Sequence, residues 1–212
     1  MNTTLETIIY KICGSEDDRI MLEKAGEILR GGGLVALPTE TVYGLGASAL
    51  SISAAEKIYA AKGRPSDNPL IVHVAEPQDA ELFAYTPPLY YKLAERFMPG
   101  PLTVIMPKRD IIPEAVTGGL DTVAIRCPIH SVARELIRCA GVPVAAPSAN
   151  RSGSPSPTSA AHVISDMLGR IDMIIDGGDC EIGVESTVIS IADGIITILR
   201  PGAVTEEMLM EV

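Results

Sequence analysis

Short runs of aliphatic and β-branched residues alternate with helix-like segments along the whole sequence, and this alternation most constrains the fold. Most of the runs are apolar at every position, which is typical of strands buried on both faces. They predict strands at 34–37, 70–74, 102–106, 122–126, 142–146, 173–175, 187–191 and 195–199. Strands separated by helices predict an α/β fold in which helices cover a sheet.

Helix signals lie between these strands. A helix-like segment at 20–30 ends at Gly31, and a second opens with a capping-box pattern at Ser53 and Glu56 and ends at Gly63. Two further helices are predicted at 131–139 and 159–168.

Asp193-Gly194 stands between the last two β-rich runs and predicts a hairpin. A hairpin pairs its strands antiparallel, so the sheet is expected to be mixed and not all parallel. The 212 residues contain no stretch that resembles a linker, which favours one domain over 1–212.

Composition and charge narrow the functional classes. Seventeen basic against 27 acidic residues give a net charge of −10, which disfavours binding of a polyanion. The N-terminus lacks a basic start followed by an apolar stretch, and no run approaches the length of a membrane span, so a soluble cytoplasmic protein without membrane contact is expected. The four cysteines and three histidines show no spacing typical of a metal site, and none of their side chains is predicted to bind metal.

Familiar nucleotide and hydrolase motifs are missing from the sequence. It contains no GxxxxGK[ST], no GxGxxG after a strand and no GxSxG. Polar residues cluster instead next to the ends of predicted strands, where ligands bind in open α/β sheets. These segments are LPTETVYGLGA, KGRPSDNP, AIRCP, APSANRSGSPSPT, GVESTV and LRPG, and they predict one shared cleft at the strand ends.

Four cations stand in these segments. Lys62 and Arg64 flank the glycine that ends a helix, and Arg126 and Arg200 each finish an apolar strand. Lys62 alone also fits a cation that complements a helix dipole, and a single strand-end arginine is often only solvated. The four together favour an anion site, because a lysine ammonium beside an arginine guanidinium is a common way to bind phosphates.

Uncharged polar residues in the same segments admit two interpretations. His73 lies inside an apolar strand and fits either a hydrogen-bonded core histidine or a group that faces a ligand. Ser148 and Asn150 follow a strand and fit either turn chemistry or ligand contact. Ser186 precedes Thr187, whose β-propensity explains the threonine but not the serine.

These segments together resemble the YrdC-domain family, the threonylcarbamoyl-AMP synthases. The motifs that carry the resemblance are PTETVYGLGA, KGRPSDNPLIVH, PGPLTVI, TVAIRCP, APSANRSGSPSPT, GVESTVI and LRPGAVT, over about residues 19 to 205. The resemblance implies an open, twisted, mostly parallel or mixed sheet with a concave cleft. It also implies condensation of L-threonine, bicarbonate and ATP, with Mg²⁺, into L-threonylcarbamoyladenylate and pyrophosphate. A tRNA-modifying transferase complex then takes the threonylcarbamoyl group, and the synthase itself is not expected to bind tRNA tightly.

The resemblance assigns residues to two substrates. The residues expected to bind ATP are Lys62, Arg64, Asn68, Thr122, Ser148, Asn150, Ser156 and Arg200. Those expected to bind threonine are Thr41, His73, Arg126, Ala146 and Ser186, with Ala146 contributing backbone groups. No dedicated catalytic pair is implied: Lys62 and Arg64 would position the reactants, and Mg²⁺ would be held by the phosphates. Longer relatives carry a further C-terminal domain, and the chain is expected to be the single-domain form.

Two other functions remain open from sequence. The family's concave surface suits double-stranded RNA, although an acidic chain with two Phe lacks the basic face and stacking aromatics of RNA-binding proteins. YrdC-like domains also occur in hydrogenase-maturation proteins that use carbamoyl phosphate and ATP. Those proteins add an acylphosphatase domain and Cys-rich zinc fingers, which the sequence lacks.

Overall fold

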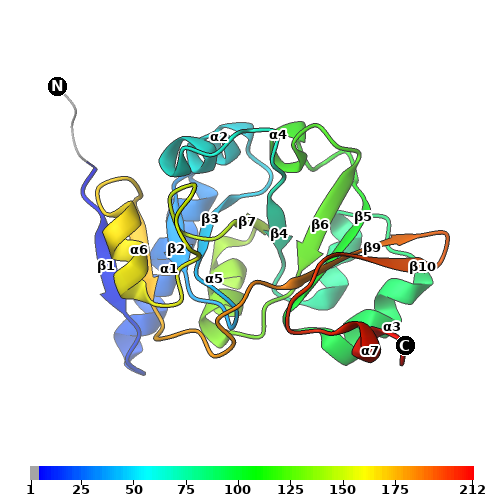
Figure 1. Cartoon of the computed structure of the whole chain (residues 1–212). Helices are drawn as coiled ribbons and strands as arrows, with labels where there is room; N and C mark the ends of the chain where they lie inside the picture. The colour runs from blue at the N-terminus through cyan, green and yellow to red at the C-terminus, as the bar shows by residue number, and fades with distance from the viewer. Residues whose placement is uncertain (1–4) are drawn as a thin grey trace.

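Within residues 5–212, which the structure describes, ten strands form one mixed sheet in the order β1-β8-β2-β3-β7-β4-β6-β5-β9-β10 (Figure 1). The structure is a computed structural model. The strands are β1 (Ile8–Lys11), β2 (Val35–Leu37), β3 (Gly44–Ser48), β4 (Ile71–His73), β5 (Leu102–Pro107), β6 (Thr122–Arg126), β7 (Val144–Ala145), β8 (Met173–Asp176), β9 (Thr187–Ala192) and β10 (Ile195–Arg200). Four pairings are parallel and five antiparallel. The predicted α/β fold with a mixed sheet is confirmed, and neither direction dominates.

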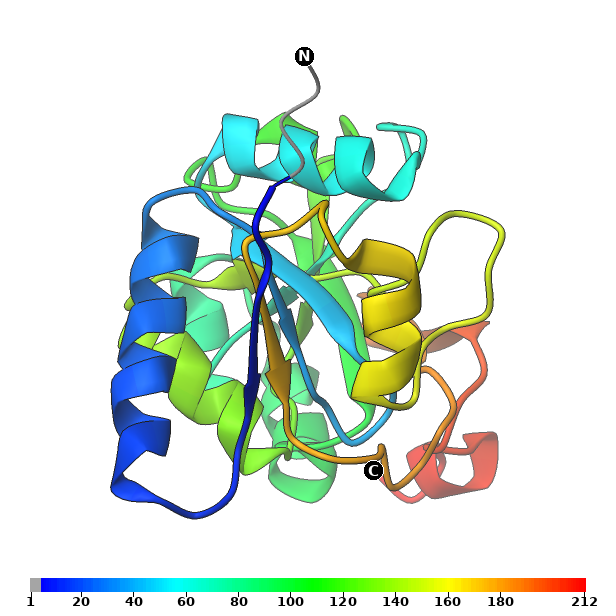
Figure 2. The same cartoon turned by 90° about the vertical axis from the view of Figure 1, so that its left-hand side faces the viewer.

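Helices cover both faces of this sheet. Seen from its β1 edge, α1 and α5 lie on one face and α6 on the other (Figure 2). The helices are α1 (Glu16–Arg30), α2 (Ile52–Lys62), the 3₁₀ helix η1 (Pro77–Leu82), α3 (Pro88–Phe97), α4 (Glu114–Thr117), α5 (Ser131–Ala140), α6 (Ala160–Met167) and α7 (Glu206–Leu209). No helix in the described part of the chain is both long enough and apolar enough to cross a membrane.

Two apolar clusters stabilise this arrangement. One lies between the sheet and the pair α1 and α5, and the larger one fills the rest of the molecule. Gly26 sits where α1 approaches α5, and a Cβ there would lie 2.6 Å from the carbonyl carbon of Cys139. The close approach of the two helices therefore requires a glycine at this position.

The predicted hairpin is confirmed between β9 and β10. Asp193 and Gly194 have φ values of 52° and 76°, as the two central residues of a primed turn require. The hairpin brings Arg200, the last residue of β10, opposite Val188, the second residue of β9.

Several local predictions were wrong. The strands β1 and β3 and the helix α3 were not predicted at all. The N-cap of α2 is Ser51, whose hydroxyl accepts the Ala54 N–H, and not Ser53. Helix α1 begins at Glu16 because Asp18, its third residue, closes a capping box with Ser15.

Candidate functional site

A cavity of about 340 Å³ opens on one face of the sheet, above strands β4, β6, β5 and β9. Strand residues form its floor and loop residues its rim. Those that line it are Thr39, Thr41, Val42, Gly44, Arg64, Asn68, Pro69, Leu70, Ile71, His73, Ile105, Ala124, Arg126, Ala146, Pro147, Ser148, Glu185, Ser186, Val188 and Arg200. The lining includes residues at the ends of strands, such as His73, Arg126 and Arg200, as predicted. The cavity also extends over the sheet beyond the predicted cleft, because Ile105 and Ala124 lie within strands.

Strand register brings two of the predicted residues together. His73 on β4 lies opposite Arg126 on the parallel strand β6, and Arg126 in turn lies opposite Thr103 on β5. Residues two apart on a strand share a face, so Ala124 and Arg126 both face the cavity.

Nine of the thirteen predicted residues line this cavity. They are Thr41, Arg64, Asn68, His73, Arg126, Ala146, Ser148, Ser186 and Arg200. The other four are Lys62, Thr122, Asn150 and Ser156, which do not line it. Thr122 opens β6 on the same face as Arg126, but beyond the cavity. Ser156 lines a neighbouring hollow together with His162.

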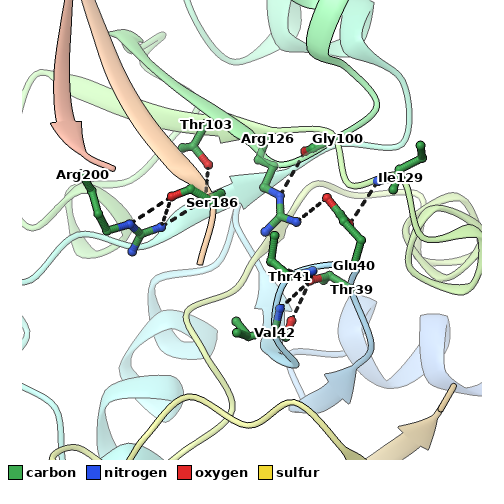
Figure 3. Close-up of polar contacts among 10 residues, drawn as sticks. All are labelled: Thr39, Glu40, Thr41, Val42, Gly100, Thr103, Arg126, Ile129, Ser186 and Arg200. Atoms are coloured by element: carbon green, nitrogen blue, oxygen red, sulfur yellow. Dashed lines mark hydrogen bonds and ion pairs between the residues drawn. The ribbon is translucent and has the colours of Figure 1, made fainter. Parts of the chain in front are cut away.

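Arg126 is held by a carboxylate that sequence reasoning missed. Its Nη2 lies 2.6 Å from Oε1 of Glu40, in an ion pair whose side chains are 5% and 3% exposed (Figure 3). The second oxygen of Glu40 accepts the N–H of Ile129 at 3.2 Å, and Nε of Arg126 donates to the carbonyl of Gly100 at 3.4 Å. The guanidinium is therefore fixed at two nitrogens, and Nη1, which has no hydrogen-bond partner among residues 5–212, remains to meet a ligand.

Arg200 is held by hydrogen bonds to Ser186 and by an ion pair with Glu185. Its Nη2 donates to the carbonyl and the hydroxyl of Ser186 at 2.9 and 3.1 Å, and the Ser186 hydroxyl lies 2.8 Å from that of Thr103 (Figure 3). Nη1 of Arg200 pairs with Glu185, whose other oxygen accepts the Ser156 hydroxyl at 2.8 Å. One carboxylate thus engages two of the residues assigned to ATP.

Lys62 lies behind the cavity wall instead of in it. The side chain is buried, and Nζ donates to the carbonyls of Ser148 and Asn150 and to Oδ1 of Asn150. Burial and the nearby Arg64 lower the pKa of Lys62 to about 8. In this arrangement Lys62 shapes the loop that presents Ser148 to the cavity.

Asn150 also acts within that loop. Its Nδ2 donates to the carbonyls of Arg151 and Ser154 at 2.9 and 2.6 Å. Both ends of the amide are therefore occupied by the chain itself, which supports the turn interpretation of Asn150 in this structure.

Arg64 stands at the rim of the cavity. Its Nη2 donates to the carbonyl of Pro69 at 3.2 Å, and burial lowers the pKa of the guanidinium. Nε is buried and makes no hydrogen bond with any residue in 5–212. Nη2 is the only nitrogen of the guanidinium that is hydrogen-bonded within 5–212, and Arg64 lines the cavity, so Nη1 can still donate to a ligand there.

His73 is buried and uncharged. Its Nδ1 lies 3.1 Å from the carbonyl of Ile71, and burial together with Arg126 lowers its pKa from 6.5 to about 3. Because Nδ1 donates to Ile71, Nε2 of the neutral ring is an acceptor.

The lowered pKa of His73 predicts an acid-sensitive fold. Between pH 6.5 and 3 the unfolded chain binds a proton that the folded chain does not, so stability is complete above pH 6.5 and falls as the pH falls. We expect His73→Gln to remove up to about 1.4 kcal/mol of this loss per pH unit. Urea unfolding at pH 6.5, 5.5 and 4.5 measures the slope, with the exposed His162→Gln as control. Equal slopes for His73→Gln and the parent would contradict a neutral buried His73.

Glu40, Glu185 and Thr39 belong to this site but were not predicted. All three stand in the polar segments that were singled out, next to residues that were assigned. A carboxylate beside predicted anion-binding groups is the signal that pointed to Glu40 and Glu185, and it gives no indication of Thr39.

The cavity combines three guanidinium groups with a single carboxylate. Arg64, Arg126 and Arg200 line it, and Glu185 is the acidic residue among the lining residues of the described chain. No group of three or more His, Cys, Asp or Glu side chains within 5–212 could hold a metal ion. Such a cavity favours anions, and two separate arginines, Arg126 and Arg200, suit two anionic groups.

Comparisons with known proteins identify the family of this fold. The Sua5/YciO/YrdC family model, described as telomere recombination, matches residues 27–202. Threonylcarbamoyl-AMP synthases of Pyrococcus abyssi and Bacillus subtilis are 53% and 55% identical over 89% of the chain, and the chain spans only 56% and 55% of their lengths. A threonylcarbamoyl-AMP synthase of Pseudomonas putida is 32% identical over 85% of the chain and 97% of its own length.

A solved structure supports the same assignment. Sua5 of Pyrococcus abyssi, complexed with L-threonine, superposes with a TM-score of 0.90 at 48% identity, covering 97% of the chain and 60% of that protein. Fold and sequence therefore agree over most of the chain. The chain belongs to the Sua5/YciO/YrdC family.

Proposed function

We propose that the chain is a nucleotidyltransferase that condenses L-threonine, bicarbonate and ATP into L-threonylcarbamoyladenylate and pyrophosphate. The observation that carries the proposal is the cavity in which all five residues of the threonine set and four of the eight residues of the ATP set meet. Ser186 lies between them: it accepts a hydrogen bond from Arg200, and its hydrogen-bond partner Thr103 lies opposite Arg126 on the neighbouring strand. The names of the relatives, including one of similar length from Pseudomonas putida, support this activity.

At the threonine end, the free Nη1 of Arg126 is suited to the substrate carboxylate. Glu40 keeps the guanidinium in place, and neutral His73 and Thr41 lie beside it. The L-threonine complex of the Pyrococcus abyssi relative supports an amino-acid site in this fold. A fixed arginine that meets a carboxylate gives a strong, directional ion pair.

The chemistry then needs two bond-forming steps. The threonine nitrogen forms a bond to the carbon of bicarbonate with loss of water, which yields a carbamate. A carbamate oxygen attacks the α-phosphorus of ATP, and the bond between the α-phosphorus and the bridging oxygen breaks to release pyrophosphate. The chain contributes position and positive charge, and orientation alone supplies roughly 7–11 kcal/mol in favourable cases.

Mg²⁺ would enter this site with ATP. Among the cavity-lining residues in 5–212, Glu185 is the one carboxylate, so the ion would be held mainly by phosphate oxygens and water, an arrangement that Mg²⁺ commonly adopts. Its charge would offset the negative charge of the phosphates, while Arg64 and Arg200 meet the same phosphates from the protein side.

The product would pass to a transferase complex that modifies an adenosine of tRNA. A net charge of −10 supports transfer of a small product over tight binding of tRNA itself. The use of ATP and the supply of a tRNA modification favour a cytoplasmic location as part of the same proposal.

The reaction is tested by its dependence on all three substrates. We expect a threonylcarbamoyladenylate peak in mass spectra only when ATP, threonine and bicarbonate are all present, because the carbamate is the nucleophile. Arg126→Ala serves as the site control and should abolish the peak. Formation of AMP at an equal rate after bicarbonate is removed would contradict the mechanism.

A further inference from the structure

The hydroxyl of Thr39 makes four polar contacts in the loop that follows β2. Its oxygen lies 2.6 Å from the carbonyl of Val42 and 3.0 Å from the hydroxyl of Thr41, and it accepts the N–H groups of Thr41 and Val42 at 3.2 and 3.3 Å (Figure 3). Thr39 and Thr41 are 2% and 0% exposed. Both line the cavity.

The direction of these hydrogen bonds follows from a count of protons. A carbonyl oxygen carries no proton, so Thr39 must donate its single hydroxyl proton to Val42. In the contact with Thr41, Thr39 can then only accept. Three donors then share the two lone pairs of the Thr39 oxygen, and the Thr41 hydroxyl at 3.0 Å is nearer than the two N–H nitrogens at 3.2 and 3.3 Å. The hydroxyl proton of Thr41 therefore points at Thr39, which leaves the lone pairs of the Thr41 oxygen for a ligand.

Ser186 shows that this polarity is specific to Thr41. The Ser186 hydroxyl accepts a hydrogen bond from Arg200 and is hydrogen-bonded to the hydroxyl of Thr103, with either of the two hydroxyls as the donor. The Thr103 hydroxyl has no second partner in 5–212 that would decide which of the two donates. Ser186 can donate or accept, whereas Thr41 can only accept.

We infer that Thr39 is a positioning residue that sets the hydrogen-bond polarity of the amino-acid end of the cavity. By holding the Thr41 proton, it makes Thr41 an obligatory acceptor, so the ligand group bound there is a donor. In threonine this donor is the hydroxyl or the amine. The inference rests on the proposed function, which supplies threonine as the ligand.

A double-mutant cycle tests whether Thr39 acts through Thr41. Thr39→Val keeps the shape but releases the Thr41 proton, and we expect threonine to bind about 5- to 10-fold more weakly. Thr41→Val should cost at least as much, and the double variant should be no weaker than Thr41→Val within about twofold, because Thr39 has nothing left to orient. Thr39→Ser restores the hydroxyl and should recover the affinity.

Calorimetry of threonine and of ATP, each with every variant, separates this role from general damage. ATP affinity should stay within about twofold, because the Thr39 contacts do not reach Arg64 or Arg200. Three results would overturn the inference. The first is a threonine affinity in the double variant that falls by the product of the two single losses. The second is a Thr39→Val protein that binds threonine as well as the parent, and the third is an ATP affinity that falls in parallel with the threonine affinity. Failure of the parent protein to bind threonine at all would instead contradict the proposed function.

L-valine identifies the donor. It keeps the amine of threonine and replaces the hydroxyl by a methyl group of similar size. If the hydroxyl is the donor, the preference for threonine over valine should shrink in Thr39→Val. A preference that stays constant while both ligands bind more weakly assigns the donor to the amine.

Discussion

We expect Glu40→Ala to lower the free energy of unfolding by about 3–5 kcal/mol, since it leaves the buried Arg126 without its counter-ion. The ion pair is 3–5% exposed, and Glu40 also accepts the N–H of Ile129. Threonine binding should fall with it, because Arg126 is no longer fixed. Urea unfolding and calorimetry with threonine measure the two effects.

An exposed ion pair supplies the matched control for Glu40. Glu135 pairs with Arg138 at 3.0 Å, with side chains 47% and 43% exposed, and Glu135→Ala should cost no more than about 1 kcal/mol. The double variant Glu40→Leu with Arg126→Met should regain most of the lost stability and still fail to bind threonine. Equal losses for Glu40→Ala and Glu135→Ala would show that burial does not strengthen the Glu40 pair.

Lys62→Met is the second substitution with a large expected effect. Methionine fills the same space but leaves the carbonyls of Ser148 and Asn150 buried without their donor, at about 1–3 kcal/mol each. We expect a loss of about 2–5 kcal/mol in unfolding free energy and weaker ATP binding, because the loop that carries Ser148 loses its anchor. Urea unfolding and ATP calorimetry provide the readouts.

Lys57 lies on the same helix and offers a close control. Its Nζ donates to the carbonyl of Gly32 at 2.6 Å, but the residue is exposed, so water can replace the lost bond. Lys57→Met should cost no more than about 1 kcal/mol and leave ATP binding unchanged. A Lys62→Met protein as stable as Lys57→Met would mean that the loop does not depend on Lys62.

Strand β6 was predictable and β3 was not, for a physical reason. Thr122–Arg126 is rich in β-branched residues, and the structure starts and ends that strand at the predicted residues. Gly44–Ser48 has the sequence GLGAS, which carries no strand preference. A Cβ on Gly46 would lie 2.8 Å from Leu37 and 2.9 Å from Val144, so packing against the neighbouring strands requires a glycine here. Because glycine has a low strand propensity, the strand could not be recognised from its sequence.

The site shows the same limit. Arg126 and Arg200 could be singled out because each ends an apolar strand, a feature local to the sequence. Glu40 gains its role from Arg126, 86 residues further on, and only the sheet topology brings them together. Lys62 appeared to be a ligand contact because its charge is visible in sequence, whereas the carbonyls that occupy it are not.

The pairing of Arg200 with Glu185 makes anion binding an exchange. Both side chains are more than a third exposed, so an incoming phosphate can reach Arg200 and displace the carboxylate. The free energy gained on binding is then the difference between the Arg200–phosphate pair that forms and the Arg200–Glu185 pair that is lost. Added salt weakens both of these pairs. The affinity of Arg200 for a phosphate should therefore depend less on ionic strength than that of a bare arginine, and Glu185 is at hand to pair with Arg200 again when the anion leaves.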